Sequence, residues 1–259
     1  MKKIGFVLLL AVVMTSFNSC INLTEVITFK KNGSGSYSLS YDMGSMISML
    51  KDMDLGKMLG GEGGEDAPDI TSELPKMVDT TVYAANMMKA TGEREEMEKK
   101  EVWEKVKVHT LVNQDKGIMN MTISFDFKEA SDITYFQSNM RELTDSGDGM
   151  GGMTGMLGGM SNSSDFLFKK RTFKRTAPKN AAAKPELNDE MAQQMQMMKM
   201  MLSDATHTTI YNFPKKVKST TIKGGVVSKD KKTLTIETGL LDLMDNANAL
   251  DGEVKLKRW

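Results

Sequence analysis

The chain has 259 residues, with 34 lysines and arginines balanced by 34 aspartates and glutamates, and a single cysteine. This length is sufficient for one large domain or two small ones. Because a neutral chain lacks the positive charge of a typical nucleic-acid-binding protein, we expect no nucleic-acid partner; the single cysteine excludes an intramolecular disulfide.

The first twenty residues follow the order of a lipoprotein signal peptide. Two lysines after the initial methionine precede an apolar run over residues 4–14, and small or polar residues then lead to Cys20. The run is too short to span a bilayer, which needs about 20 residues. Phe17-Asn18-Ser19-Cys20 resembles a relaxed lipobox. We predict that residues 1–19 are a signal peptide and that Cys20 carries the lipid, as the first residue of the mature chain.

Lipidation of Cys20 limits both the location and the chemistry of the protein. Lipoproteins that this sequence resembles carry two or three acyl chains, palmitate among them, so the anchor would hold the chain on a membrane of the cell envelope. Ile21 follows where an Asp would indicate retention in the inner membrane, which favours the outer membrane. No thiol would remain for catalysis or metal binding.

Two segments predict β-hairpins, each followed by a helix. Residues 25–41 alternate in polarity around an Asn-Gly-Ser-Gly turn, and residues 102–127 alternate around a turn at 114–117. Asp42 can cap a helix that continues to residue 53, and Ser131 or Asp132 can cap one that runs to Leu143.

The other expected elements follow in chain order. Helical character is predicted over residues 70–97 and 190–202, and for a short helix at 240–244. Single strands are predicted at 165–176, 206–213, 217–227, 233–238 and 253–257.

These elements predict an α+β fold, with a largely antiparallel sheet and Met-rich helices packed on one face. We expect a single domain over residues 20–259. Gly-, Met-, Ser- or Pro-rich composition predicts flexible insertions near 56–69, 144–164 and 177–186.

Two parts of the chain resemble a known family. The Lys31-Asn32-Gly33-Ser34-Gly35 turn near the start, and the segments Tyr211–Thr220 and Ser228–Leu234 near the end, are similar to LppM-like lipoprotein domains. The resemblance covers residues 22–44 and 205–259. It implies a membrane-anchored α+β domain and carries over no catalytic residue.

Few residues suit catalysis or metal binding. The two histidines, His109 and His207, lie on strands among polar residues, where we expect surface positions. Neither a zinc-binding HExxH nor a phosphate-binding glycine loop occurs. We therefore predict no catalytic residue, no metal site and no cofactor. A hydrolase that uses two carboxylates is the enzymatic alternative, because such a pair needs no local motif.

The 25 methionines allow three interpretations. Met191, Met195 and Met198 share one face of a predicted helix, and Met43, Met46 and Met53 repeat the pattern. Such a stripe is typical of core packing; thioethers also suit Cu(I), and Met-rich helices can form an adaptable groove for an apolar ligand or a protein. The sequence thus predicts a non-enzymatic, membrane-anchored binding or structural module.

Overall fold

A computed structural model describes residues 21–45, 75–86, 98–145, 163–178, 196, 199 and 202–258, and it gives side chains for these residues except 141–145. The described residues form two sheets and a few helices, which confirms the α+β fold with mostly sheet. Cys20, the three predicted flexible insertions (apart from their margins) and most of the Met-rich helical segments lie outside the described residues.

The larger sheet has eight strands in the order β10-β11-β8-β1-β2-β5-β4-β3. Seven neighbouring pairs form its ladder; β1 (Asn22–Phe29) and β8 (Thr206–Asn212) are parallel, and the other pairs are antiparallel. The remaining strands are β2 (Gly35–Asp42), β3 (Met77–Tyr83), β4 (Lys107–Asn113), β5 (Ile118–Phe127), β10 (Val226–Val227) and β11 (Thr233–Gly239).

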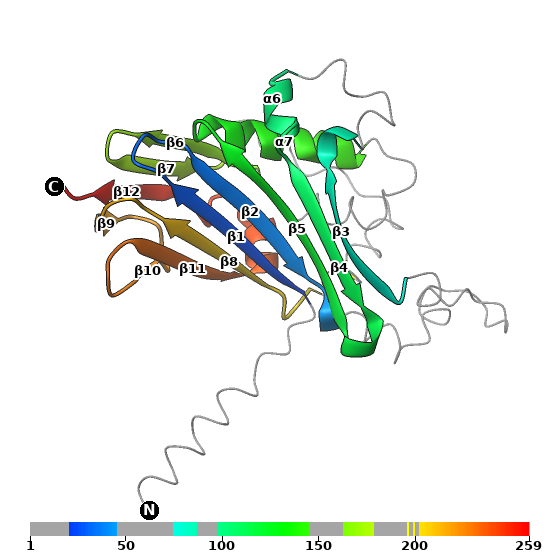
Figure 1. The fold of residues 1–259 in the computed structure, drawn as a ribbon. Helices are drawn as coiled ribbons and strands as arrows, with labels where there is room; N and C mark the ends of the chain where they lie inside the picture. Colours follow the sequence, from blue (N-terminus) through cyan, green and yellow to red (C-terminus); the bar gives the residue numbers. More distant parts are fainter. Residues whose placement is uncertain are drawn as a thin grey trace, which may run out of the picture.

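A smaller antiparallel sheet has the order β6-β7-β12-β9. It lies behind the larger sheet in the view of Figure 1, together with α7 and α10. Its strands are β6 (Asp165–Lys169), β7 (Thr172–Thr176), β9 (Val217–Thr220) and β12 (Gly252–Leu256); the helices are α6 (Lys100–Trp103), η2 (Gln114–Lys116), α7 (Ser131–Asp145) and α10 (Leu240–Asp245). Among the described helices, none is both long and apolar enough to cross a membrane.

Strand alternation decides which face of the larger sheet is buried. Every second residue of β1 and β2 is buried, and the intervening positions are mostly Ser and Thr with partial exposure. Ser40 on β2 and Thr122 on β5 pair their hydroxyls at 3.0 Å on this polar face. The sheet thus has one core face and one wetter face, as the alternation predicts.

The core face carries a cluster of aromatic rings that joins the two sheets. The ring of Phe29 stacks on Phe168 of β6, with centroids 4.5 Å apart, and lies 5.2 Å from Phe173 of β7. Tyr37 and Phe125 continue the cluster toward Phe136 of α7. These contacts hold the smaller sheet and α7 against the larger one.

The structure corrects three expectations about elements. Residues 77–83, expected to be helical, form the edge strand β3. Residues 165–176 form two strands joined by a tight turn, and residues 217–227 contribute β9 and β10 to different sheets. In addition, Ile21 is already buried and β1 begins at Asn22, three residues before the expected start of the first hairpin at residue 25.

Candidate functional site

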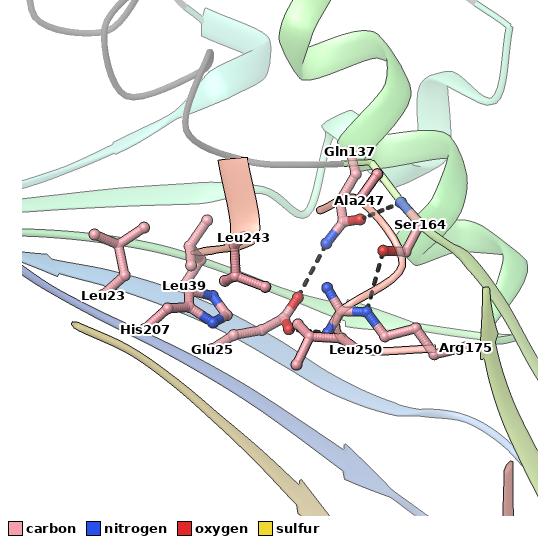
Figure 2. A pocket seen from close by; sticks show the side chains of 10 residues that line it. All are labelled: Leu23, Glu25, Leu39, Gln137, Ser164, Arg175, His207, Leu243, Ala247 and Leu250. Atoms are coloured by element: carbon pink, nitrogen blue, oxygen red, sulfur yellow. Dashed lines mark hydrogen bonds and ion pairs between the residues drawn. The ribbon is translucent and has the colours of Figure 1, made fainter. Parts of the chain in front are cut away.

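A buried ion pair lies between the two sheets. Glu25 sits on β1 in phase with Leu23 and Ile27, so the alternation that buries these neighbours also buries its carboxylate. Arg175 of β7 points to it from the facing sheet, and its Nη1 donates to Glu25 Oε2 at 2.5 Å (Figure 2). Both side chains are at most 5% exposed, so the pair is shielded from solvent.

Side chains from three further elements complete the bonding of this pair. Gln137 of α7 donates from Nε2 to Glu25 Oε1 at 3.0 Å and accepts from the backbone N–H of Ser164 at 3.0 Å. Arg175 donates from Nε to Ser164 Oγ at 3.1 Å and from Nη1 to the Tyr211 hydroxyl at 2.9 Å. Figure 2 shows Gln137 and Arg175 reaching Glu25, with Ser164 bonded to both of them. A buried polar group is tolerated when it is satisfied in this way.

The charge state of the pair follows from its surroundings. Burial raises the pKa of Glu25. The charge of Arg175 and the hydrogen bonds to the Glu25 carboxylate lower it and outweigh burial, so the pKa lies below the usual value for a glutamate. Burial opposes the charge on Arg175 too, yet the attraction of Glu25 raises the pKa of the guanidinium further above neutrality. The site therefore contains a salt-bridged carboxylate, not a proton donor.

His207 of β8 is the third titratable group here, and its position corrects a sequence-based expectation. It was expected at the surface, but its side chain is buried beside Glu25, with Nδ1 3.3 Å from the hydroxyl oxygen of Thr209. Burial lowers the pKa of His207 to about 4, although the charge of Glu25 acts in the opposite direction. The imidazole is neutral at neutral pH.

The space among these groups is small. The cavity lined by Glu25, Gln137, Arg175 and His207 has a volume of about 20 Å³, which is the room that a single water molecule needs. A glycan or peptide substrate does not fit, and every oxygen of the carboxylate already accepts a hydrogen bond. The geometry suits a structural polar centre that fixes how the sheets and α7 are stacked.

The described part of the chain brings no two buried carboxylates together, as the hydrolase alternative would in a closed site. There the two buried carboxylates are Glu25 and Asp132. Asp132 bonds to Lys99 at 3.1 Å and accepts from the backbone N–H groups of Lys128 and Glu129, so it holds the segment before α7 against the first turn of the helix. Each carboxylate thus has its own cation, and the two do not form a pair.

The other predicted site residues are spread over the fold or lie outside the described residues. His109 of β4 is 42% exposed, as expected, and its Nε2 lies 2.9 Å from Asp79 Oδ1. No group of three or more metal-binding side chains occurs within the described ranges. Of the predicted Met stripes, Met43 is described, and it is buried in the core. Cys20 stays a prediction.

The polar centre was missed in the sequence, although one signal was present. Glu25 is the only charged residue in phase with Leu23, Ile27 and Phe29, and Arg175 is in phase with buried Phe173. A charged residue at a strand position that otherwise alternates with the buried apolar residues indicates a buried charge with a partner. The sequence does not identify Arg175 as the partner of Glu25. The two residues lie in different sheets, and they meet only because the sheets stack on each other.

The described fold defines the class of this domain: an α+β domain of two stacked sheets around a buried polar centre. No protein-family model and no curated protein matches the chain. Among solved structures, the NMR structure of the folded domain of LppM from Mycobacterium tuberculosis is similar over 93% of both chains, at 8% identity and a TM-score of 0.38. A likeness at this level is too low to assign a function.

Proposed function

We propose that the chain is a lipid-anchored lipoprotein of the cell envelope, and that its domain acts as a non-enzymatic binding or structural module. The observation that carries the second part is the closure of the polar centre. A cavity of about 20 Å³ around a fully bonded carboxylate leaves no place for a substrate. The module would therefore act through contacts on its surface.

The start of the fold supports the proposed anchor. The carbonyl oxygen of Ile21 accepts a hydrogen bond from the backbone N–H of Thr206 at 3.3 Å, and β1 begins at the next residue. Cys20 is therefore joined directly to the larger sheet. A lipid on Cys20 would hold this end of the domain close to the membrane surface, without a long tether.

The experiment compares Cys20→Ser with the native chain in cells grown with labelled palmitate. We expect the native chain to carry the label and to sediment with membranes, and the variant to lose both properties. Ser19→Ala is the matched control, since it keeps a small residue before the cysteine and should be labelled normally. A native chain without label, or a variant that stays on membranes unlabelled, would contradict the anchor.

The outer membrane is the proposed location, because Ile21 takes the position where Asp would favour the inner membrane. Separation of the two membranes on a density gradient tests it. The native chain should follow outer-membrane markers. A native chain in the inner-membrane fraction would refute this location and leave the anchor itself intact.

A further inference from the structure

A basic groove lies beyond the Phe29 end of β1, opposite to Asn22. It has a volume of about 860 Å³ and is formed by the turn between β6 and β7, by β9, and by β12 with the residues after it, at the left in Figure 1. Apart from Thr172 and Leu256, every residue that lines it is a lysine or an arginine: Lys169, Lys170, Arg171, Lys218, Lys255, Lys257 and Arg258.

Backbone pairing brings further basic segments to the same end. Leu256 bonds to Arg171, and Val217 bonds to Lys231 of the β10–β11 turn. The stacking of Phe29 on Phe168 brings the β1–β2 turn beside β6. The segments that meet here are 30–34, 169–172, 213–218, 228–232 and 256–258. Their one carboxylate is Asp230, which is held by Ser228 and by the backbone N–H of Lys232.

The positive charge of the groove is largely unneutralised. Lys255 pairs with Glu253 at 3.2 Å, whereas the other lining cations form no ion pair with any described residue. Like charges gathered in a concave site repel one another, and they focus a positive potential that attracts anions. Because the fold gains no ion pairs from most of these cations, a ligand is the simplest reason for their arrangement.

One residue of the groove also has an unfavourable backbone conformation. Lys170 has a φ of 58°, in the left-handed region where a residue with a Cβ is uncommon. The turn directs consecutive basic residues 169–171 into the groove instead of using the glycine that this conformation favours. Local backbone strain of this kind is concentrated at functional sites.

We propose that this groove binds an acidic glycan, a flexible polymer recognised through its phosphate or carboxylate groups. The lining contains no aromatic side chain, which argues against stacked nucleic-acid bases. Its apolar member, Leu256, is buried, so the apolar and aromatic centre of a typical protein interface is also absent. A polar polyanion that needs only charge contacts fits these features.

The groove and the proposed anchor are at opposite ends of β1. Asn22 and Phe29 mark these ends, and a strand of this length extends about 25 Å. The groove lies beyond the Phe29 end, so we favour a polymer over the headgroups of the membrane that would hold Cys20. The choice of an envelope glycan rests on the proposed location, but the binding itself does not depend on lipidation.

The test measures binding of the purified full chain, in neutral detergent, to four fluorescent probes and to anionic vesicles. The probes are polygalacturonate, phosphorylated dextran, neutral dextran and double-stranded DNA. We expect at least one acidic glycan to bind about tenfold or more tightly than neutral dextran, and added salt to weaken that binding, as screening requires. The two acidic glycans distinguish carboxylate from phosphate as the recognised group.

Lys218→Glu/Lys257→Glu reverses two charges in the groove, and Lys100→Glu/Lys116→Glu makes the same change in charge on α6 and η2, away from it. All four lysines are exposed. We expect the first variant to bind at least about tenfold more weakly and the second to stay within about twofold of the native chain. If the first variant does not fold, Lys218→Gln/Lys257→Gln replaces it, with the same direction of change.

Three results would overturn the proposal. They are no binding of either acidic glycan at low salt, tighter binding of DNA or of anionic vesicles than of both glycans, and an equal loss in the groove variant and its control. Failure of palmitate labelling would refute the anchor without changing this binding result, so the two proposals fail separately.

Discussion

The carboxylate of Glu25 receives hydrogen bonds from Arg175, Gln137 and Thr209, which belong to β7, α7 and β8. One side chain therefore connects the smaller sheet, a helix and the larger sheet. Breaking a buried pair by removing one partner costs more than removing both, because a lone charge is left without solvent or counter-charge. This asymmetry can be measured.

Arg175→Met should lower the free energy of unfolding by about 3–5 kcal/mol, since it leaves the Glu25 carboxylate uncompensated. Glu25→Gln/Arg175→Met should recover part of that loss, because a neutral amide replaces the carboxylate. Urea unfolding of the two single variants and the double variant gives the coupling energy. A loss below about 1 kcal/mol for Arg175→Met would mean that the pair does not hold the sheets together.

His207 makes stability depend on pH. Its pKa is about 4 in the fold against 6.5 for the free group, so the unfolded chain binds more protons between these values and stability falls as pH decreases from 6.5 to 4. The shift corresponds to at most about 3 kcal/mol. The lowered pKa of Glu25 acts in the same direction, because its stabilisation is lost as acid protonates the carboxylate.

Urea unfolding at several pH values tests this dependence. His207→Gln should flatten the curve between pH 6.5 and 4. If this variant has the same pH profile as the native chain, the buried imidazole does not account for the dependence.

Among the elements, the β1–β2 hairpin depends on a glycine that no other residue can replace. A Cβ on Gly35 would lie 1.9 Å from the carbonyl oxygen of Thr28 and 2.5 Å from the ring of Phe127. The first contact is with backbone and cannot be relieved by a rotamer change. Gly35→Ala should therefore lower the free energy of unfolding by about 3 kcal/mol or more.

Thermal melts of Gly35→Ala test this expectation. Gly117→Ala serves as a comparison, since its Cβ would meet no atom within 4 Å and its cost would come only from the positive φ of 61°. A smaller loss for Gly35→Ala than for Gly117→Ala would contradict the close packing of this hairpin.

The β6–β7 turn allows the opposite experiment. Lys170→Gly removes the penalty of the left-handed conformation, which is about 1 kcal/mol, and should raise the melting temperature by a few degrees. Lys169→Gly, one residue earlier in β6, should lower it, because glycine weakens a strand. A lower melting temperature for Lys170→Gly would show that the turn is not strained.

The same elements show how far the sequence predicts the fold. The first hairpin was predicted correctly, and so was the second from Lys107 onward, because the alternation of polarity survives where one face of the sheet is wet. Residues 102 and 103, expected at the start of the second hairpin, belong instead to α6. Strand β3 was not predicted because it is an edge strand that is exposed at almost every position. Its sequence therefore shows no alternation of apolar and polar residues. The parallel pairing of β1 with β8 joins residues about 184 positions apart, such as Thr206 and Asn22, and no local pattern encodes it.

For the whole molecule, a net charge of zero conceals a local concentration of positive charge. The cations that line the groove come from β6, β7, β9 and β12 and from the residues after β12, which are far apart in the sequence. Composition alone therefore could not predict the basic surface that folding creates.

Both ends of the described chain lie inside sheets, which gives the last prediction. Strand β1 sits between β8 and β2, and β12 sits between β7 and β9. Val254 and Leu256 of β12 are buried, and burial of two such side chains stabilises the fold by about 3–6 kcal/mol before the ladder hydrogen bonds are counted. That is comparable with the whole stability of many domains.

A chain that stops after Asp251 should therefore fail to fold, because both neighbours of β12 lose their partner and the aromatic core is opened. Far-UV circular dichroism and limited proteolysis should show loss of cooperative melting and rapid cleavage. A chain that stops after Lys257 keeps all of β12 and should melt like the native one. If the shorter chain melts cooperatively within a few degrees of the native melting temperature, β12 is not required for the stability of the fold. Strands β1 and β12 would then not depend on each other, and the two sheets would be separable units.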